Sequence, residues 1–254
     1  MRSFTTWDGI AIAYQEWGER ASLPPVVLHH GFIADANANW VAPGVVRALV
    51  AAGRHVLAPD ARGHGRSGKP HDPRFYGEQR MARDLAVLLE VIGAREIDLV
   101  GYSMGAVVAL IFASEEEPVR RLVVGGVGAG IIECGGVDRR AMSNESVIEA
   151  LSVADPAALG ESGGASAFRA LADALGGDRM ALVAQARSVF RGQIALDRIS
   201  APTLLLAGEA DPLAVRPALL AEAIPDARLQ IVSGDHVGAV ADAGFARSIV
   251  DFLA

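Results

Sequence analysis

A five-residue motif, G-Y-S-M-G at residues 101–105, constrains this chain more than any other feature of its sequence. Residues 97–100 are a short β-rich run and residues 106–113 are a continuous apolar run, so the motif falls where a strand turns into a helix. Glycines flank Ser103 because so abrupt a turn leaves no room for neighbouring side chains and strains the central residue. The motif therefore predicts an exposed Ser103 hydroxyl at the amino end of a helix.

Ser103 has two possible roles in this setting. Serine is a favoured N-cap, so its hydroxyl could simply accept a hydrogen bond from the first turn of the helix. Alternatively, the helix dipole favours developing negative charge at this position, and a hydroxyl placed there can act as a nucleophile. The strand before the motif and the helix after it favour the nucleophile.

Segments with strand and helix patterns alternate along most of the chain. Residues 3–6 and 10–17 alternate apolar and polar side chains around Asp8-Gly9 and predict a β-hairpin. Further strands are predicted at residues 26–29, 55–58, 97–100, 121–124, 203–207 and 228–232, and helices at residues 45–52, 78–92, 106–113, 214–223 and 242–253. This rhythm predicts an α/β fold with a mostly parallel central sheet and helices on both faces.

The composition changes between residues 125 and 200. Gly, Ala and Ser dominate there, β-branched runs disappear, and helices are predicted at residues 144–151, 165–175 and 178–190. We therefore expect a core formed by residues 1–124 and 201–254, interrupted by a small helical insertion at residues 125–200.

Charge and cysteine content narrow the choice of partners. The net charge of -7 leaves no excess of Lys and Arg to neutralise phosphates, so a nucleic-acid partner is not expected. The sequence has no apolar run of about 18 residues that would span a membrane, and residues 1–10 show no secretory signal. The single cysteine, Cys134, excludes an internal disulfide and fits a reducing compartment. We expect a cytoplasmic protein with a small-molecule substrate, whose oligomeric state is unknown from sequence.

Residues that directly follow strands carry the chemistry in such a fold, because ligands bind at the carboxyl ends of parallel strands. A serine nucleophile needs a general base, and His236 follows the last predicted strand. The histidine in turn needs an acid to hold its tautomer, and Asp211 lies just past the strand at residues 203–207. Asp235, directly before His236, is a competing carboxylate, but an adjacent residue usually points its side chain away.

Other motifs carry less weight. A literal G-x-G-x-x-G at residues 63–68 would bind a dinucleotide only if it opened a helix, and the two prolines within residues 69–73 prevent one. The remaining histidines lack metal-ligand spacing, and Cys134 lacks a companion motif. We expect neither a cofactor nor a metal.

Five segments together resemble the α/β-hydrolase superfamily over nearly the whole chain: H-H-G-F at residues 29–32, D-x-R-G-x-G-x-S at 60–67, G-Y-S-M-G at 101–105, G-x-x-D at 208–211 and G-D-H at 234–236. The S-M-G around Ser103 is similar to esterase, cofactor-free haloperoxidase and perhydrolase, and carbon-carbon hydrolase branches. A serine in place of aspartate argues against haloalkane dehalogenase and soluble epoxide hydrolase chemistry. The resemblance implies an oxyanion hole formed by the backbone N–H groups of Phe32 and Met104, and it implies that residues 125–200 form a cap.

These features predict a serine hydrolase that cleaves a small to medium carboxylic ester, lactone or thioester through an acyl-enzyme, with Ser103, Asp211 and His236 as its triad. The insertion contains few aromatic residues besides Phe168 and Phe190, which favours an apolar acyl group. Perhydrolase or haloperoxidase-like and carbon-carbon hydrolase activities would use the same triad. A non-catalytic small-molecule binding protein of the same fold is the remaining alternative.

Overall fold

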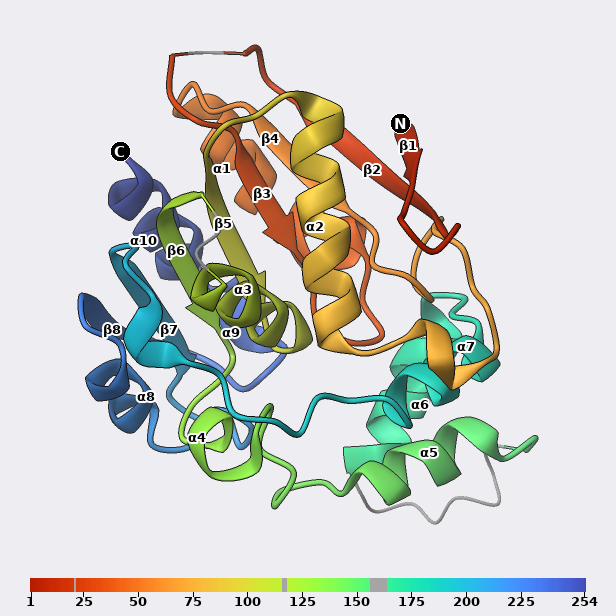
Figure 1. The fold of residues 1–254 in the computed structure, drawn as a ribbon. Coiled ribbons are helices and arrows are strands. Elements are labelled where there is room, and N and C mark those ends of the chain that lie inside the picture. Colours follow the sequence, from red (N-terminus) through yellow and green to blue (C-terminus); the bar gives the residue numbers. More distant parts are fainter. Residues whose placement is uncertain (21, 116–117, 156–163) are drawn as a thin grey trace.

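The computed structural model describes residues 1–20, 22–115, 118–155 and 164–254. In this part of the chain a central eight-stranded sheet has the order β1-β2-β4-β3-β5-β6-β7-β8 (Figure 1). The strands are β1 (Arg2–Thr5), β2 (Ala11–Trp17), β3 (Val26–His29), β4 (Val56–Pro59), β5 (Ile97–Tyr102), β6 (Val119–Gly125), β7 (Thr203–Gly208) and β8 (Ala227–Val232). Strand β2 pairs antiparallel with β1 and β4, and every later pair from β4 to β8 is parallel.

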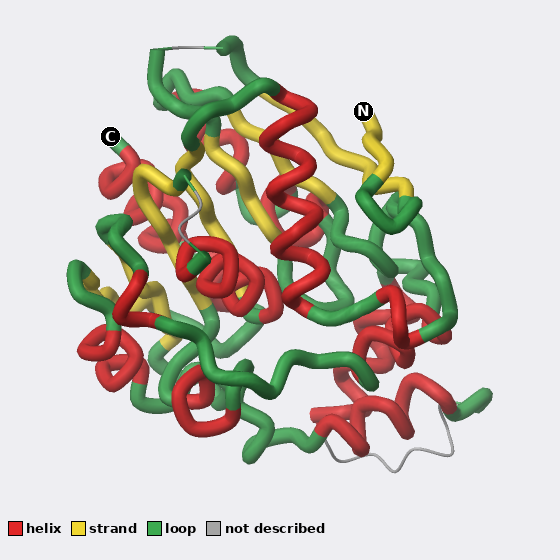
Figure 2. The backbone as a smooth tube through the Cα atoms, viewed as in Figure 1, coloured by secondary structure: helices red, strands yellow, loops and turns green. Residues whose placement is uncertain are grey.

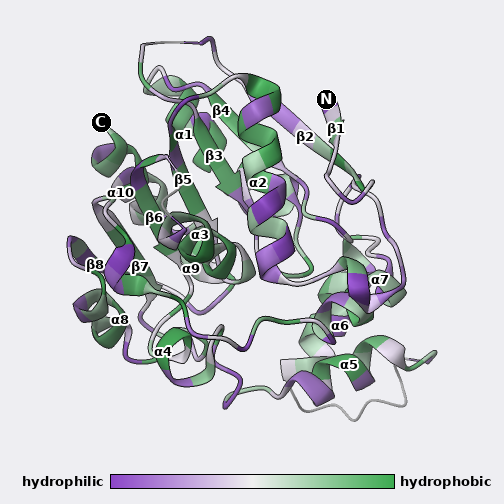
Figure 3. Cartoon of the chain, viewed as in Figure 1, coloured by the Kyte–Doolittle hydropathy of each residue, from purple (hydrophilic) through white to green (hydrophobic). Residues whose placement is uncertain are grey.

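Helices cover both faces of the sheet (Figure 2). One face packs against α2 (Glu78–Ile92), α3 (Met104–Ser114) and α8 (Pro217–Ala223), and the other against α1 (Val45–Ala51), α9 (Gly238–Ala241) and α10 (Ala243–Leu253). In β3, Val27 enters the first layer while Val26 and Leu28 enter the second, because successive side chains of a strand point to opposite faces. Burial on both sides explains why the central strands are predominantly apolar (Figure 3), with Asp98 in β5 and Arg120 and Arg121 in β6 as exceptions.

This architecture confirms the expected fold class, a mostly parallel sheet with helices on both faces. Helix α2 and strand β3 have the bounds that the sequence pattern predicts, while several other elements begin or end a few residues away. Helix α8 starts at Pro217 rather than at Ala214, because proline at the first helical position loses no hydrogen bond. No helix in the described ranges reaches the length and apolarity that crossing a bilayer requires.

Short helical turns also occur where the sequence pattern predicts loops. The segment between β3 and α1 contains a π-helix, η1 (Asn37–Val41), which buries Trp40 and Asn39. Two further short helices, α4 (Gly130–Cys134) and α9, have five and four residues. Segments of this length are too short to show a helical period, so their sequences carried no signal.

In its described residues the insertion has three helices of eight or more residues, α5 (Asn144–Ser152), α6 (Gly164–Ala174) and α7 (Arg179–Ala186). They pack around a small apolar cluster that includes Val147, Leu151, Ala172 and Leu182. In Figure 1 these helices lie beyond the carboxyl ends of β3 and β5. The arrangement is compatible with a cap at residues 125–200, and that division of the chain stays a prediction.

Candidate active site

Ser103 lies on the sharp turn between β5 and α3. Its backbone has φ 54° and ψ -115°, a conformation that L-residues rarely adopt. A Cβ atom added to Gly101 would overlap the carbonyl oxygen of Gly105, and one added to Gly105 would overlap the carbonyl oxygen of His29. Both positions therefore require glycine, and the structure has the strand-to-helix turn that the motif predicts.

The Ser103 hydroxyl does not cap α3. Its Oγ instead lies 2.9 Å from Nε2 of His236. On the other side of the ring, Nδ1 of His236 lies 3.0 and 2.8 Å from the two carboxylate oxygens of Asp211. Because a carboxylate only accepts, it selects the tautomer with hydrogen on Nδ1, which leaves Nε2 free to accept the Ser103 proton. The structure thus brings together the three residues that the sequence analysis selected.

Each of the three residues follows a different strand of the parallel sheet. Ser103 comes directly after β5, Asp211 after β7, and His236 after β8. The Asp211 side chain is buried, and its Oδ1 also accepts the backbone N–H of Leu213 at 2.8 Å, which fixes the carboxylate. Such a buried negative charge stabilises a positive imidazolium.

The competing carboxylate, Asp235, binds backbone N–H groups of the following turn. Its Oδ1 accepts the backbone N–H groups of Gly238 at 2.8 Å and Val237 at 3.1 Å. The hydrogen bond from Gly238 is the main cause that holds the pKa of Asp235 below its ordinary value. The described hydrogen bonds of the His236 ring go to Asp211 and Ser103, so Asp235 points away as sequence adjacency suggests.

The residues proposed for the oxyanion hole lie beside Ser103. A Cβ on Gly31 would be 3.3 Å from Cβ of Ser103, which places the loop after β3 next to the serine. The side chain of Asn39 accepts the Gly31 N–H at 2.8 Å and fixes this loop. Within the described ranges, the N–H groups of Phe32 and Met104 have no hydrogen-bond acceptor. Both remain able to bind an anionic oxygen, and this role stays a prediction.

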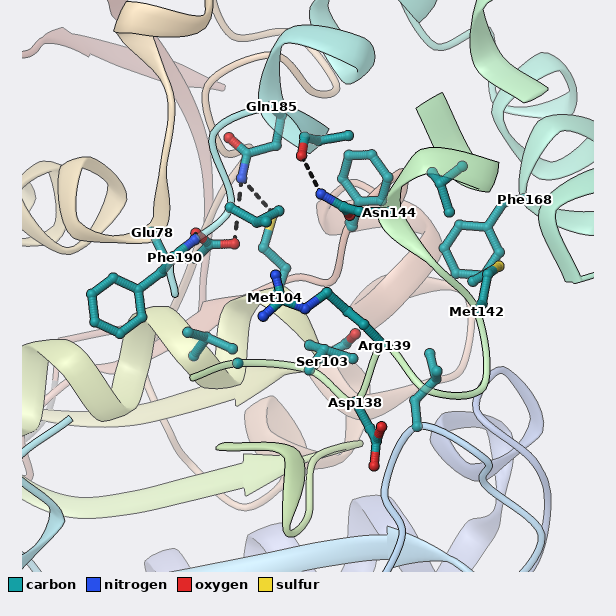
Figure 4. Close-up of a pocket in the computed structure, with 18 residues that line it drawn as sticks. Glu78, Ser103, Met104, Asp138, Arg139, Met142, Asn144, Phe168, Gln185 and Phe190 are labelled. Carbon is teal, nitrogen blue, oxygen red and sulfur yellow. Dashed lines mark hydrogen bonds between the residues drawn. The ribbon is translucent and has the colours of Figure 1, made fainter. Parts of the chain in front are cut away.

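A pocket of about 100 Å³ opens next to Ser103 (Figure 4). Apolar side chains from both parts of the chain line it, among them Val107 from α3, Val147 from α5, and the two aromatic residues Phe168 and Phe190. Side chains of the insertion therefore form part of the wall of the cavity that contains Ser103. An apolar wall of this kind is typical of small-molecule sites.

Five polar side chains that line the pocket were not predicted from the sequence: Glu78, Asp138, Arg139, Asn144 and Gln185. Burial raises the pKa of the Glu78 carboxyl to about 7, although the N–H of Phe190 donates a 2.6 Å hydrogen bond to it. Glu78 is the first residue of α2, where an acidic residue usually faces water and complements the helix dipole. Nothing in the local sequence distinguishes such a residue from a buried one.

The glycine-rich segment at residues 60–68 has a structural role. The Asp60 carboxylate accepts the backbone N–H groups of Ala36 at 3.0 Å and Arg66 at 2.9 Å. Arg62 is fully buried and forms ion pairs with Asp84 at 2.5 Å and Asp8 at 2.9 Å. The segment runs as turns without an α-helix, so it lacks the helix amino terminus that would bind a pyrophosphate.

Three further histidines form a buried cluster under the loop that contains Phe32. The rings of His29 and His30 lie 5.8 Å apart, and those of His30 and His64 lie 5.2 Å apart. Burial lowers the pKa of His29 and of His64 to about 3, so both rings are neutral near neutral pH. Among the residues that the structure describes, no three His, Cys, Asp or Glu side chains cluster as a metal site would require.

Fold and site together define a class of protein. Sheets of this kind that present a serine on a strand-to-helix turn, followed along the chain by an acid and then a histidine, are the α/β hydrolases. A family model described as alpha/beta hydrolase fold matches residues 24–134. This match covers less than half of the chain, and the fold of the described residues is that of the α/β hydrolases.

Three known proteins illustrate the similarity. A non-heme chloroperoxidase from Streptomyces lividans is 37% identical over 123 residues, which are 47% of this chain and 41% of that protein. Epoxide hydrolase A from Mycobacterium tuberculosis is 40% identical over 101 residues, which are 40% of this chain and 30% of that protein. The chain thus spans less than half the length of these curated relatives. The crystal structure of a hydrolase from Pseudomonas aeruginosa PA01 matches 99% of this chain and 97% of its own, with 25% identity and a TM-score of 0.78.

Proposed function

We propose that the protein is a serine hydrolase that cleaves a small to medium carboxylic ester, lactone or thioester. The observation that carries this proposal is the alignment of Ser103 Oγ, the His236 ring and the Asp211 carboxylate through hydrogen bonds of 2.8–3.0 Å. A general base must lie within hydrogen-bond reach of the proton that it removes, and Nε2 of His236 satisfies this condition before any substrate binds.

The mechanism follows from the roles of the three residues. Ser103 Oγ attacks the carbonyl carbon while its proton passes to Nε2 of His236, and Asp211 stabilises the imidazolium. The backbone N–H groups of Phe32 and Met104 hold the negative oxygen of the tetrahedral intermediate. His236 then protonates the leaving alcohol or thiol, which breaks the ester bond and leaves an acyl-enzyme. Water, deprotonated by His236, attacks the acyl carbon and releases Ser103.

Residues 125–200 act as a cap in this proposal. They supply the pocket wall opposite Ser103, including Val147 and Phe168, so the acyl group binds between the cap and the core. The size of the pocket suits a small to medium substrate rather than a polymer. The single cysteine, Cys134, agrees with a reducing, cytoplasmic setting.

A perhydrolase or haloperoxidase-like activity is a second candidate, and the similarity to the Streptomyces lividans chloroperoxidase favours it. In that case hydrogen peroxide would replace water as the acceptor of the acyl group, and a peracid would be the product. The similarity to epoxide hydrolase A suggests no third candidate, because Ser103 stands where that chemistry requires a carboxylate nucleophile.

The test is a panel of p-nitrophenyl esters, lactones and thioesters, each with and without hydrogen peroxide. We expect turnover of the shorter esters, and a fall in kcat by a factor on the order of 10⁶ in Ser103→Ala. A fluorophosphonate probe should label one peptide, the one that contains Ser103. Full turnover by Ser103→Ala, or labelling elsewhere, contradicts the proposal. Ligand-induced thermal shifts without any turnover would instead indicate a binding protein.

A further inference from the structure

Arg139 is a cation in the wall of the catalytic pocket. Figure 4 shows its side chain extending into the pocket, and its Nη2 is anchored by a 2.5 Å hydrogen bond to the Cys134 carbonyl oxygen. Among the described residues, no carboxylate forms an ion pair with Arg139. The Nε–H and Nη1–H groups and one of the two Nη2 hydrogens lack described acceptors, so a pair of parallel N–H groups is available to a ligand.

The acidic residues nearest to Arg139 in sequence are already neutralised by other cations. Arg140 forms ion pairs with Asp138 at 2.5 Å and with Glu133 at 2.6 Å, and Arg216 also pairs with Glu133 at 2.6 Å. The Asp138 carboxylate lines the pocket as well, but the Arg140 guanidinium holds its pKa below the ordinary value. Neither of these two carboxylates forms an ion pair with Arg139.

Glu78 is the other acidic group of the pocket, and it is poorly suited to neutralise Arg139. The two side chains form no ion pair, although the charge of Arg139 is among the causes that lower the pKa of Glu78. Burial is the largest cause and raises that pKa to about 7, so a large share of the carboxyl carries a proton near neutral pH. One of its oxygens already accepts the Phe190 N–H. A protonated carboxyl of this kind donates a hydrogen bond, which an anionic ligand would accept.

We propose that Arg139 binds a carboxylate of the substrate, so that the preferred substrates are esters or lactones that carry a second, free carboxylate. A guanidinium binds a carboxylate through two parallel hydrogen bonds, and most of the other side chains that line the pocket are apolar. This inference rests on the proposed hydrolase function and names its substrate class. Arg139 is then the residue that determines specificity, while Ser103 performs the chemistry.

The test compares monomethyl esters of four- to eight-carbon dicarboxylic acids with neutral analogues in which the free carboxylate is a carboxamide. We expect the wild type to prefer the best anionic ester by at least about tenfold in kcat/KM. Arg139→Gln should lose about 10- to 100-fold on that ester, mainly through KM, and less than about threefold on its amide analogue. On the anionic ester, the kcat/KM of Arg139→Lys should lie between those of the wild type and Arg139→Gln, because an ammonium group cannot bind both carboxylate oxygens in parallel.

Arg187→Gln is the matched control, because it removes the same charge from an exposed position at the end of α7. Arg187→Gln should keep the wild-type preference for the anionic ester over its amide analogue. No anionic preference in the wild type, or an equal loss on both substrates in Arg139→Gln, overturns the inference while leaving the hydrolase function intact.

Binding of monomethyl glutarate to Ser103→Ala, measured by calorimetry, separates the two proposals. Suppose that the wild type cleaves no ester, that Ser103→Ala binds monomethyl glutarate, and that the double variant Ser103→Ala, Arg139→Gln does not bind it. This result would support the carboxylate site and contradict the hydrolase function. Equal binding with and without Arg139 overturns the site.

Discussion

The hydroxyl of Tyr102 donates a 2.7 Å hydrogen bond to the carbonyl oxygen of His236, and the two rings lie 5.3 Å apart. The residue directly before the serine thereby holds the loop that contains the histidine. Burial raises the pKa of the Tyr102 hydroxyl, so it remains a protonated donor throughout the usual pH range. The turn after β5 thus positions both Ser103 and the ring that faces it.

Replacing Tyr102 by Phe should slow catalysis more than it destabilises the fold. Loss of one hydrogen bond costs about 1 kcal/mol of stability, whereas a looser His236 is less often aligned with Ser103. We expect kcat to fall by roughly tenfold with KM changed less than about threefold. Steady-state kinetics and thermal melting of Tyr102→Phe measure both effects. An unchanged kcat would show that the loop is held by other contacts.

Asp211→Asn and Asp235→Asn form a matched pair that tests the acid. Asn at position 211 favours the wrong tautomer of His236, and losses of about 10⁴ in kcat are known for such a change in a serine triad. Asp235→Asn removes the same charge from a side chain that contacts only backbone N–H groups among the described residues, so we expect less than about a tenfold loss. The kcat of the two variants on the same ester shows which carboxylate is the triad acid, and circular dichroism checks that both variants are folded. The reverse order of effects would make Asp235 the acid.

Glu78 should make the fold less stable as the pH rises. Its pKa is about 7 in the folded protein and near 4.5 when unperturbed, so between these values the unfolded chain releases a proton that the folded chain retains. Unfolding is therefore favoured progressively from about pH 4.5 to pH 7, by a total of about 3 kcal/mol. Urea unfolding at pH 5 and pH 8 measures this contribution as the difference between the wild type and Glu78→Gln, because the pH dependence that the buried His29 and His64 add in the opposite direction is the same in both proteins.

Glu90→Gln is the control for this measurement, because Glu90 is exposed on the same helix. The stability of Glu90→Gln should change between pH 5 and pH 8 as that of the wild type does. Parallel curves for the wild type and Glu78→Gln between pH 5 and pH 8 would show that the Glu78 carboxyl does not titrate in this range.

Gly105→Ala should destabilise the protein by about 3 kcal/mol or more, because its Cβ would overlap a backbone oxygen that cannot move aside. The backbone at Gly105 is ordinary helix, so the loss comes from the overlap alone. Gly164→Ala is the comparison: it is also helical, and its Cβ meets only the flexible Met142 side chain at 3.2 Å. We expect that variant to be neutral or slightly more stable. Equal stability of both variants in urea would contradict the explanation.

Features encoded by neighbouring residues could be predicted from the sequence. The G-Y-S-M-G motif predicts the turn at Ser103 because both glycines are required within four residues of one another. Helix α2 has its predicted bounds because its apolar residues follow the helical period and Gly93 ends it with φ 66°. The pairing of Asp211 with His236 followed from topology, since both come after neighbouring parallel strands.

Features created by tertiary contact could not be predicted in the same way. Glu78 and Arg139 belong to segments far apart in the chain, and each resembles an ordinary surface charge in its local sequence. Their presence in one pocket depends on how the insertion lies on the core. The sequence analysis therefore described the pocket as apolar and missed its charged side chains.

The order of Ser103 and His236 in the chain also has a consequence during synthesis. The two residues are 133 positions apart, and His236 follows β8, which pairs with β7 at the edge of the described sheet. A ribosome that adds about 5–20 residues per second needs on the order of ten seconds to travel from one to the other. During that interval the nascent chain contains the serine but neither β8 nor the base. Hydrolytic activity would therefore begin only after the last strand has joined the sheet, and a prematurely terminated chain would be inert.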